Sequence, residues 1–191
     1  MIDSHAKARL REDLRDTHDA LLAKLDGLSD HDVRRALTRT GTNLLGLVKH
    51  LATWEARYLG EVFGRPFPDP LPRWDDESAR SADLWAAEHE SRSDVLALHH
   101  RVRAHTDTTI DTLPLDAPGH VPWWPSPTVT LFDVLVHLLT ETSRHAGHAD
   151  ILREQLDGVT DTAPEKDDDF WRAHRATIDH AARVTSDGSP G

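Results

Sequence analysis

The chain has 191 residues, about one domain, and its 38% hydrophobic and 29% charged residues indicate a globular rather than a disordered protein. The formal net charge of −11 argues against nucleic acid as a partner, and no apolar run approaches the ~20 residues that span a bilayer. The absence of cysteine excludes disulfides, thiolate ligands and a cysteine nucleophile, so any thiol chemistry must use a thiol from a co-substrate.

The sequence pattern of the first half of the chain predicts two long helices with a short one between them. Residues 4–27 carry leucines at steps of three, four and seven, the pattern of an amphipathic helix. This segment lacks the apolar core of a signal peptide, so we expect a cytoplasmic protein. Ser29 is placed to cap a short helix, and a second long helix begins at Asn43 or one residue earlier and runs to about Phe63. Its apolar face contains Leu44, Leu47, Leu51, Trp54, Tyr58 and Val62.

The second half alternates proline-rich connections with helices. The segment Arg65–Asp76 holds too many prolines to be helical and is expected to be a loop. A third long helix is predicted from Ser81 or Ala82 to about Leu113. A second proline-rich stretch over 114–127 follows. We see no convincing strand in it, with a brief pairing of its HVPWW segment as the alternative.

The C-terminal part of the chain completes the predicted fold. Thr128 or Thr130 caps a fourth long helix that ends at Asp157-Gly158. A polar linker then leads to a short helix over Phe170–Val184 and a loose tail. The fold class is therefore all-α: a four-helix bundle over residues 1–160, with residues 161–191 forming a linker, an additional short C-terminal helix and a flexible tail of the same domain.

The seam of the fourth helix carries the candidate chemistry. Steps of three and four select a row that is aliphatic at both ends and ionisable in the middle: Leu131, Val134, Leu138, Glu141, His145, His148 and Leu152. A buried carboxylate without a partner is costly, and the i, i+4 spacing of Glu141 and His145 allows both side chains to share one ion. A third ligand must come from another helix, and His50 is the best candidate because it flanks the apolar face of the second helix.

Three such ligands form an open site of the catalytic type. Two imidazoles and one carboxylate suit a divalent metal ion, Zn²⁺ first, with Ni²⁺ or Fe²⁺ as other choices. His148 is a fourth ligand or a hydrogen-bond partner of the site, and His137 lies one turn before Glu141. The alternative is a metal-free His–Glu network that holds the helices in register.

Other polar and aromatic residues favour ordinary roles. Eight of the 14 histidines lie in polar contexts and are expected at the surface: His5, His18, His31, His89, His99, His100, His174 and His180. Trp123 and Trp124 are expected to form a hydrophobic plug, with a pocket wall as the alternative. The charges of Glu141 and Arg144 are expected to form part of a solvated face.

Three segments of the sequence resemble the DinB-like superfamily of metal-binding four-helix bundles. They are TNLLGLVKHLATWEARYLGEVFGRP, the later WWP, and LVHLLTETSRHAGHADILREQLDG, which together extend the resemblance over about residues 5–160. The nearest branch is the actinobacterial one of mycothiol S-transferase-like proteins. The family's metal ligands fall on His50, Glu141 and His145. Many relatives have histidine at the position of Glu141. The glutamate here resembles instead the ligand pattern of mycothiol-dependent maleylpyruvate isomerase.

The resemblance implies a metal-dependent transferase that activates a low-molecular-weight thiol of the mycothiol type for attack on an electrophilic small molecule, as in detoxification. His148 or His137 is implied as the catalytic proton acceptor. Arg144 and Trp54 are implied to contact the thiol, with Arg153 and Arg73 as other candidates for an anionic part of it. The competing functions are a non-catalytic metal-binding bundle with a stress-related role and a metal-dependent hydrolase. Family bundles often pair, so a homodimer is a further expectation.

Overall fold

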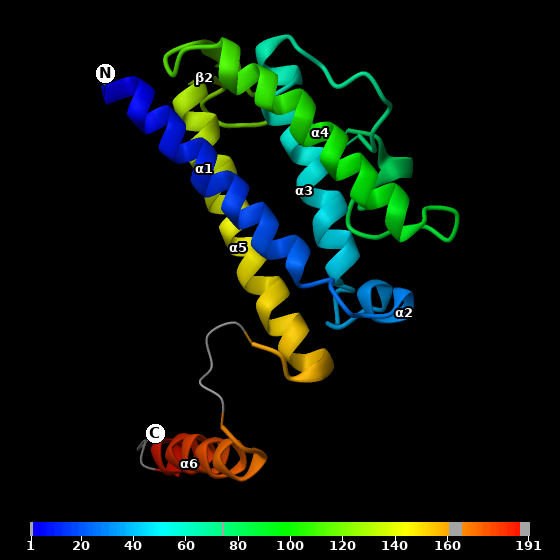
Figure 1. Cartoon of the computed structure of the whole chain (residues 1–191), viewed down its shortest axis with the longest axis vertical. Coiled ribbons are helices and arrows are strands. Elements are labelled where there is room, and N and C mark those ends of the chain that lie inside the picture. The colour runs from blue at the N-terminus through cyan, green and yellow to red at the C-terminus, as the bar shows by residue number, and fades with distance from the viewer. Residues whose placement is uncertain (1, 74, 161–165, 188–191) are drawn as a thin grey trace. The chain divides into compact units, whose positions relative to one another are not determined.

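The computed structural model describes residues 2–73, 75–160 and 166–187. The chain divides into two compact units, Met1–Val159 and Thr160–Gly191. The first unit is built on four long helices (Figure 1): α1 (Ile2–Ala23), α3 (Leu44–Tyr58), α4 (Arg92–Thr112) and α5 (Leu131–Asp157). A short α2 (Asp30–Arg34) connects α1 to α3. The prediction of an all-α four-helix bundle with an added C-terminal helix is confirmed.

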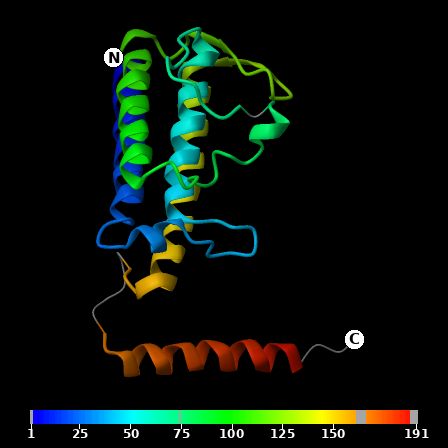
Figure 2. The same cartoon turned by 90° about the vertical axis from the view of Figure 1, so that its right-hand side faces the viewer.

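The helices pack in two pairs, α1 along α5 and α3 along α4, and α3 also contacts α5 (Figures 1 and 2). One core cluster contains Leu14, Tyr58, Val134 and Leu138. A second contains buried leucines from α1, α3 and α5: Leu21, Leu45, Leu51 and Leu152. The contact of α3 with α5 places the candidate ligands of the two helices in one neighbourhood.

The predicted helix boundaries hold where a local capping motif sets them. The Ser29 side chain accepts a hydrogen bond from the Asp32 backbone and caps α2. Thr130 and Asp133 form a reciprocal capping box at the start of α5. Gly158 ends α5 in the left-handed conformation, φ 77°, which costs glycine little.

The third long helix begins ten or eleven residues later than predicted. The sequence pattern suggested a start at Ser81 or Ala82, but α4 starts at Arg92 with a Ser91–Asp94 capping box. The intervening segment of residues 80–90, here called the 80–90 loop, passes over α3 instead. Its carbonyl groups accept side-chain hydrogen bonds that replace those of a helix: Asn43 donates to Leu84, Lys49 to Trp85, and Arg34 to Ala86, Ala87 and Glu90.

Gly46 allows the 80–90 loop to lie this close to α3. A Cβ atom built at Gly46 would stand 2.0 Å from the Leu84 carbonyl oxygen, well inside van der Waals contact. Any larger residue would therefore push the loop away. The close approach brings Asp83, which precedes Leu84, against the side of α3 that carries His50.

The connections on either side contain short elements that the sequence pattern missed. Helix α3 ends at Tyr58, earlier than the predicted Phe63, and a 3-10 turn, η1 (Glu61–Phe63), follows; a second one, η2 (Glu77–Ala79), precedes the 80–90 loop. The stretch predicted to lack strands forms an antiparallel pair, β1 (Pro118–His120) with β2 (Thr128–Thr130), in which Gly119 pairs with Val129. This pair brackets Trp123 and Trp124 and fixes the ends of their loop.

The second unit contains α6 (Asp168–Asp187), which begins two residues before and ends three residues after the predicted helix. Phe170, Ile178 and Val184 of this helix are exposed. Residues 161–165 of the predicted linker and 188–191 of the predicted tail lie outside the described residues. Among the helices that the structure describes, none has the length and apolar character needed to cross a bilayer.

Candidate active site

The candidate ligands come together where α3 faces α5. The centroids of the His50 and His145 rings lie 5.0 Å apart, in an edge-to-face arrangement. On α5, the Nε2 atom of His145 lies 3.7 Å from Oε2 of Glu141. Two ligands of one ion, each at about 2.0–2.2 Å and with a near-tetrahedral angle between them, lie about 3.5 Å apart. The spacing between Glu141 and His145 is thus close to that of two ligands of a shared ion.

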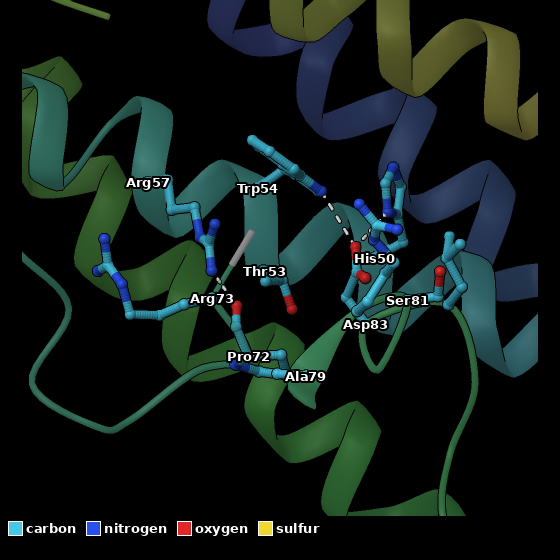
Figure 3. A pocket seen from close by; sticks show the side chains of 11 residues that line it. His50, Thr53, Trp54, Arg57, Pro72, Arg73, Ala79, Ser81 and Asp83 are labelled. Atoms are coloured by element: carbon cyan, nitrogen blue, oxygen red, sulfur yellow. Dashed lines mark hydrogen bonds and ion pairs between the residues drawn. The ribbon is translucent and has the colours of Figure 1, made fainter. Parts of the chain in front are cut away.

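The two histidines are oriented through their Nδ1 atoms. His50 Nδ1 lies 2.7 Å from Oδ2 of Asp83, which also accepts a 3.0 Å hydrogen bond from the indole of Trp54 (Figure 3). His145 Nδ1 contacts Nδ1 of His148 at 3.4 Å. Engaging Nδ1 leaves the lone pair of Nε2 for a cation, and a carboxylate behind a metal-bound histidine is a frequent arrangement.

His50, Glu141 and His145 are of the kinds that bind a divalent ion, and the distance between Glu141 and His145 suits a shared one. Three donor atoms do not yet converge, however: no group of three or more His, Cys, Asp or Glu side chains in the described part of the chain is already arranged to hold a metal ion. His50, Glu141 and His145 therefore form a candidate donor set whose metal stays a proposal.

A cavity of about 220 Å³ opens beside the candidate ligands, lined by His50, Glu141, Trp54, Tyr58, Trp123 and His137 among others. The indoles of Trp123 and Trp124 each donate a 3.1 Å hydrogen bond to the Tyr58 hydroxyl, which attaches their loop to α3. The two tryptophans pack on the core, as a plug would, and Trp123 also forms cavity wall. The His137 ring lies 4.8 Å from each of the Tyr58 and Trp124 rings.

Burial controls the charge of the site's ionisable groups. It lowers the pKa of His145 to about 4, with the charges of His50 and His148 acting in the same direction. Burial also lowers the pKa of His137. At Asp83, burial alone would raise the pKa, but the hydrogen bond and charge of His50 lower it overall. At neutral pH, His137 and His145 are therefore uncharged and Asp83 is a carboxylate.

Comparison with known proteins identifies the family. A model of the family described as mycothiol-S-transferase matches residues 9–158, which include every candidate ligand. The chain belongs to the mycothiol-S-transferase family. A search of curated proteins gave no match. Among solved structures, the chain is similar to a crystal structure of a conserved protein from Enterococcus faecalis, with a TM-score of 0.56 and 17% identity, covering 80% of this chain and 97% of that one. At that identity the likeness shows the fold alone.

Family membership supports a mycothiol-related transferase function, so the positions of the other predicted site residues matter. Trp54 lines the cavity, and its contact with the thiol stays a prediction. Arg144 is exposed and forms an ion pair with Glu141 at 2.6 Å. Unlike Glu141, it is not one of the residues that line the cavity. Arg153 donates to the carbonyl groups of Lys24 and Asp26, a structural role at the end of α1. His148 is exposed and contacts His145.

In this member of the mycothiol-S-transferase family, the sequence pattern missed Asp83. Its segment was predicted to begin a helix, and no spacing relates it to His50, 33 residues earlier. Only the passage of the 80–90 loop over Gly46 brings the two together.

Two histidines that were expected at the surface are buried instead. His18 of α1 and His99 of α4 are each 1% exposed, with His18 Nδ1 3.0 Å from His99 Nε2. His18 Nε2 lies 2.8 Å from Oε2 of the buried Glu55. This distance is short enough for an ion pair, although the geometry does not meet that of a hydrogen bond. Thr106 donates a 2.6 Å hydrogen bond to the same carboxylate. The polar neighbours in the sequence gave no sign of this, because burial here depends on three helices meeting.

Proposed function

We propose that this protein is a metal-dependent transferase that activates a mycothiol-type thiol for attack on an electrophilic small molecule. The observation that supports it most is the pair of facing histidines, His50 and His145, each with Nδ1 engaged and Nε2 left for a cation near Glu141. Zn²⁺ is the ion we favour, with Ni²⁺ or Fe²⁺ as other choices. Xenobiotic or metabolic electrophiles are the proposed substrates, as in detoxification.

His50, Glu141 and His145 would hold the ion and leave positions open for the thiol. When bound, a divalent ion would lower the pKa of a coordinated thiol, so that the sulfur is a nucleophilic thiolate at neutral pH. Asp83 keeps the Nδ1 proton on His50 and thereby presents Nε2 to the site. The aromatic wall of Trp54, Tyr58 and Trp123 limits the access of water to the cavity.

His137 is the proposed acceptor of the thiol proton. It lines the cavity and is uncharged at neutral pH, because burial lowers its pKa. The reaction forms a bond between the thiol sulfur and an electrophilic carbon. Either the leaving group departs with the electrons of its bond, or the electrophile's double bond opens and its other carbon takes the proton back from His137. His148 instead contacts His145 through Nδ1, which suits an orienting role.

The first test is elemental analysis of the purified protein and of His50→Ala, with His174→Ala on α6 as the control. We expect about one divalent ion per chain in the wild type and the control, and loss of the ion in His50→Ala. Conjugation of mycothiol with a panel of generic electrophiles should stop on chelation and return with added metal. Stoichiometric metal without any thiol conjugation would instead favour a non-catalytic metal-binding bundle, and turnover without thiol would favour a hydrolase.

Homodimer formation stays a prediction. The leucines of α1, whose apolar face suggested it, are largely used within the bundle: Leu14 and Leu21 are 2% and 0% exposed. Exposed apolar side chains lie on α5 instead, at Phe132, Val136 and Ile151. Light scattering during size-exclusion chromatography would measure the mass directly.

A further inference from the structure

A second cavity, of about 250 Å³, also has His50 in its wall (Figure 3). Residues of α3 form one wall, among them His50, Trp54 and Arg57, and the connections before and within the 80–90 loop form the other. His50 and Trp54 line both this cavity and the one described above. These two side chains therefore form a common wall between the second cavity and the candidate active site.

Arg57 is a buried cation at the side of this cavity opposite His50 (Figure 3). It is 2% exposed; its guanidinium donates to the carbonyl oxygen of Pro72 and lies 5.1 Å from the centre of the Trp54 ring. Its Nε atom is buried without a hydrogen-bond partner, and no carboxylate within the described residues forms an ion pair with it. Burial lowers the pKa of Arg57, but an arginine remains charged at neutral pH.

The other charges around the cavity are already compensated. Arg73 pairs with Asp75 at 2.8 Å and lies 3.7 Å from Glu61, and Arg80 pairs with Glu77 at 3.3 Å. Asp83, the carboxylate among the lining residues, uses Oδ2 for His50 and Trp54. Glu61, Asp83 and Asp75 attract Arg57 from a distance, but none of the described carboxylates forms an ion pair with it.

A buried guanidinium with an unsatisfied donor and no carboxylate in contact is unfavourable, and its planar set of donors matches a carboxylate. We propose that this cavity is the electrophile subsite and that Arg57 binds a carboxylate of the electrophile. Residues 50 and 57 lie two helical turns apart on one face of α3, about 10 Å along its axis. A carboxylate at Arg57 thus leaves room for a short apolar chain along Trp54, with the reactive carbon directed toward His50. The assignment to the electrophile rests on the proposed transferase function; the anion site itself does not.

The binding test uses hexanoate as the probe and the neutral hexanamide as its matched partner, with metal-free protein and no thiol. Calorimetric titration should show hexanoate binding to the wild type and no binding of hexanamide. Arg57→Met keeps the apolar stem and removes the charge, and should weaken hexanoate binding at least 10-fold. Arg101→Met, which removes an exposed arginine paired with Asp69, should leave it unchanged. Arg57→Lys keeps the charge in case Arg57→Met does not fold, and should bind hexanoate more weakly than the wild type.

A second arm tests the assignment to the electrophile, using metal-loaded enzyme and mycothiol with 6-iodohexanoate or 6-iodohexanamide. In both, the sulfur–carbon bond forms as the carbon–iodine bond breaks, and iodide leaves. The enzyme should prefer the carboxylate substrate through a lower KM, and Arg57→Met should remove that preference. Equal hexanoate binding by wild type and Arg57→Met, or no binding by the wild type, would overturn the proposal. Binding without any conjugation would retain the anion site and reject the transferase.

Discussion

The buried pair His18–His99 makes a quantitative prediction about stability and pH. His99 is held 3.0 Å from His18 of α1, with Glu55 of α3 beyond it and Arg103 and His100 of α4 nearby. Burial, reinforced by the charge of His18, lowers the pKa of His99 to about 3, although Glu55 opposes this shift. The folded protein therefore excludes a proton that the unfolded chain accepts below about pH 6.5.

The sign and size of the effect follow from this difference. Between pH 6.5 and 3 the unfolded state binds more protons at His99, so the free energy of unfolding falls as the pH falls. A group with a pKa of about 6.5 unfolded and about 3 folded contributes a loss of about 2 kcal/mol between pH 7 and pH 5. That is a large share of the ~5–15 kcal/mol typical of a domain.

Urea unfolding at several pH values between 7 and 5, followed by tryptophan fluorescence, measures this loss. His99→Gln removes the titrating group and keeps a polar side chain, so its free energy of unfolding should fall by about 2 kcal/mol less than that of the wild type over this range. His31→Gln, at an exposed position of α2, serves as the control and should follow the wild type. The comparison cancels other groups, including His145. Parallel curves for wild type and His99→Gln would refute the reasoning.

Three further predictions concern the bundle and the site. Glu55→Ala should lower the free energy of unfolding, measured in urea, by about 3–5 kcal/mol, because it leaves the buried charges around that carboxylate without a partner. The pKa of Glu55 is lowered to about 2 in the folded protein. Its contribution to stability is therefore fully present above about pH 4.5 and is lost as the pH falls toward 2. Gly46→Ala should cost about 1–3 kcal/mol through its clash with the 80–90 loop, whereas Gly147→Ala, whose Cβ meets nothing within 4 Å, should be neutral or stabilising. Asp83→Asn should weaken Co²⁺ or Zn²⁺ binding about 10–100-fold in competition with a chromophoric chelator, and Asp75→Asn should not. Unchanged affinity in Asp83→Asn would argue against its orienting role.

Local signals in the sequence determined the helical architecture of this protein. The leucine spacing of α1, the Ser29 cap, the Thr130 capping box and Gly158 each act within a few residues, so they can be read without the fold. The ionisable residues on the α5 seam were also readable, because a helix places i and i+4 on one face. The position of His50 beside the apolar face of the second helix made it the candidate third ligand, and the structure brings its ring to His145.

The tertiary structure alone decided which residues support the site and which histidines are buried. Residues 81–91 have helical propensity. However, the side chains of Asn43, Lys49 and Arg34, from other parts of the chain, donate hydrogen bonds to the loop carbonyls and keep the segment from forming a helix. Asp83 acquires its surroundings through this loop, Arg57 contacts the connection before it at Pro72, and the burial of His18 and His99 requires α1 and α4 to meet. Such contacts join residues tens of positions apart, so no local periodicity encodes them; they exist only once the helices have packed.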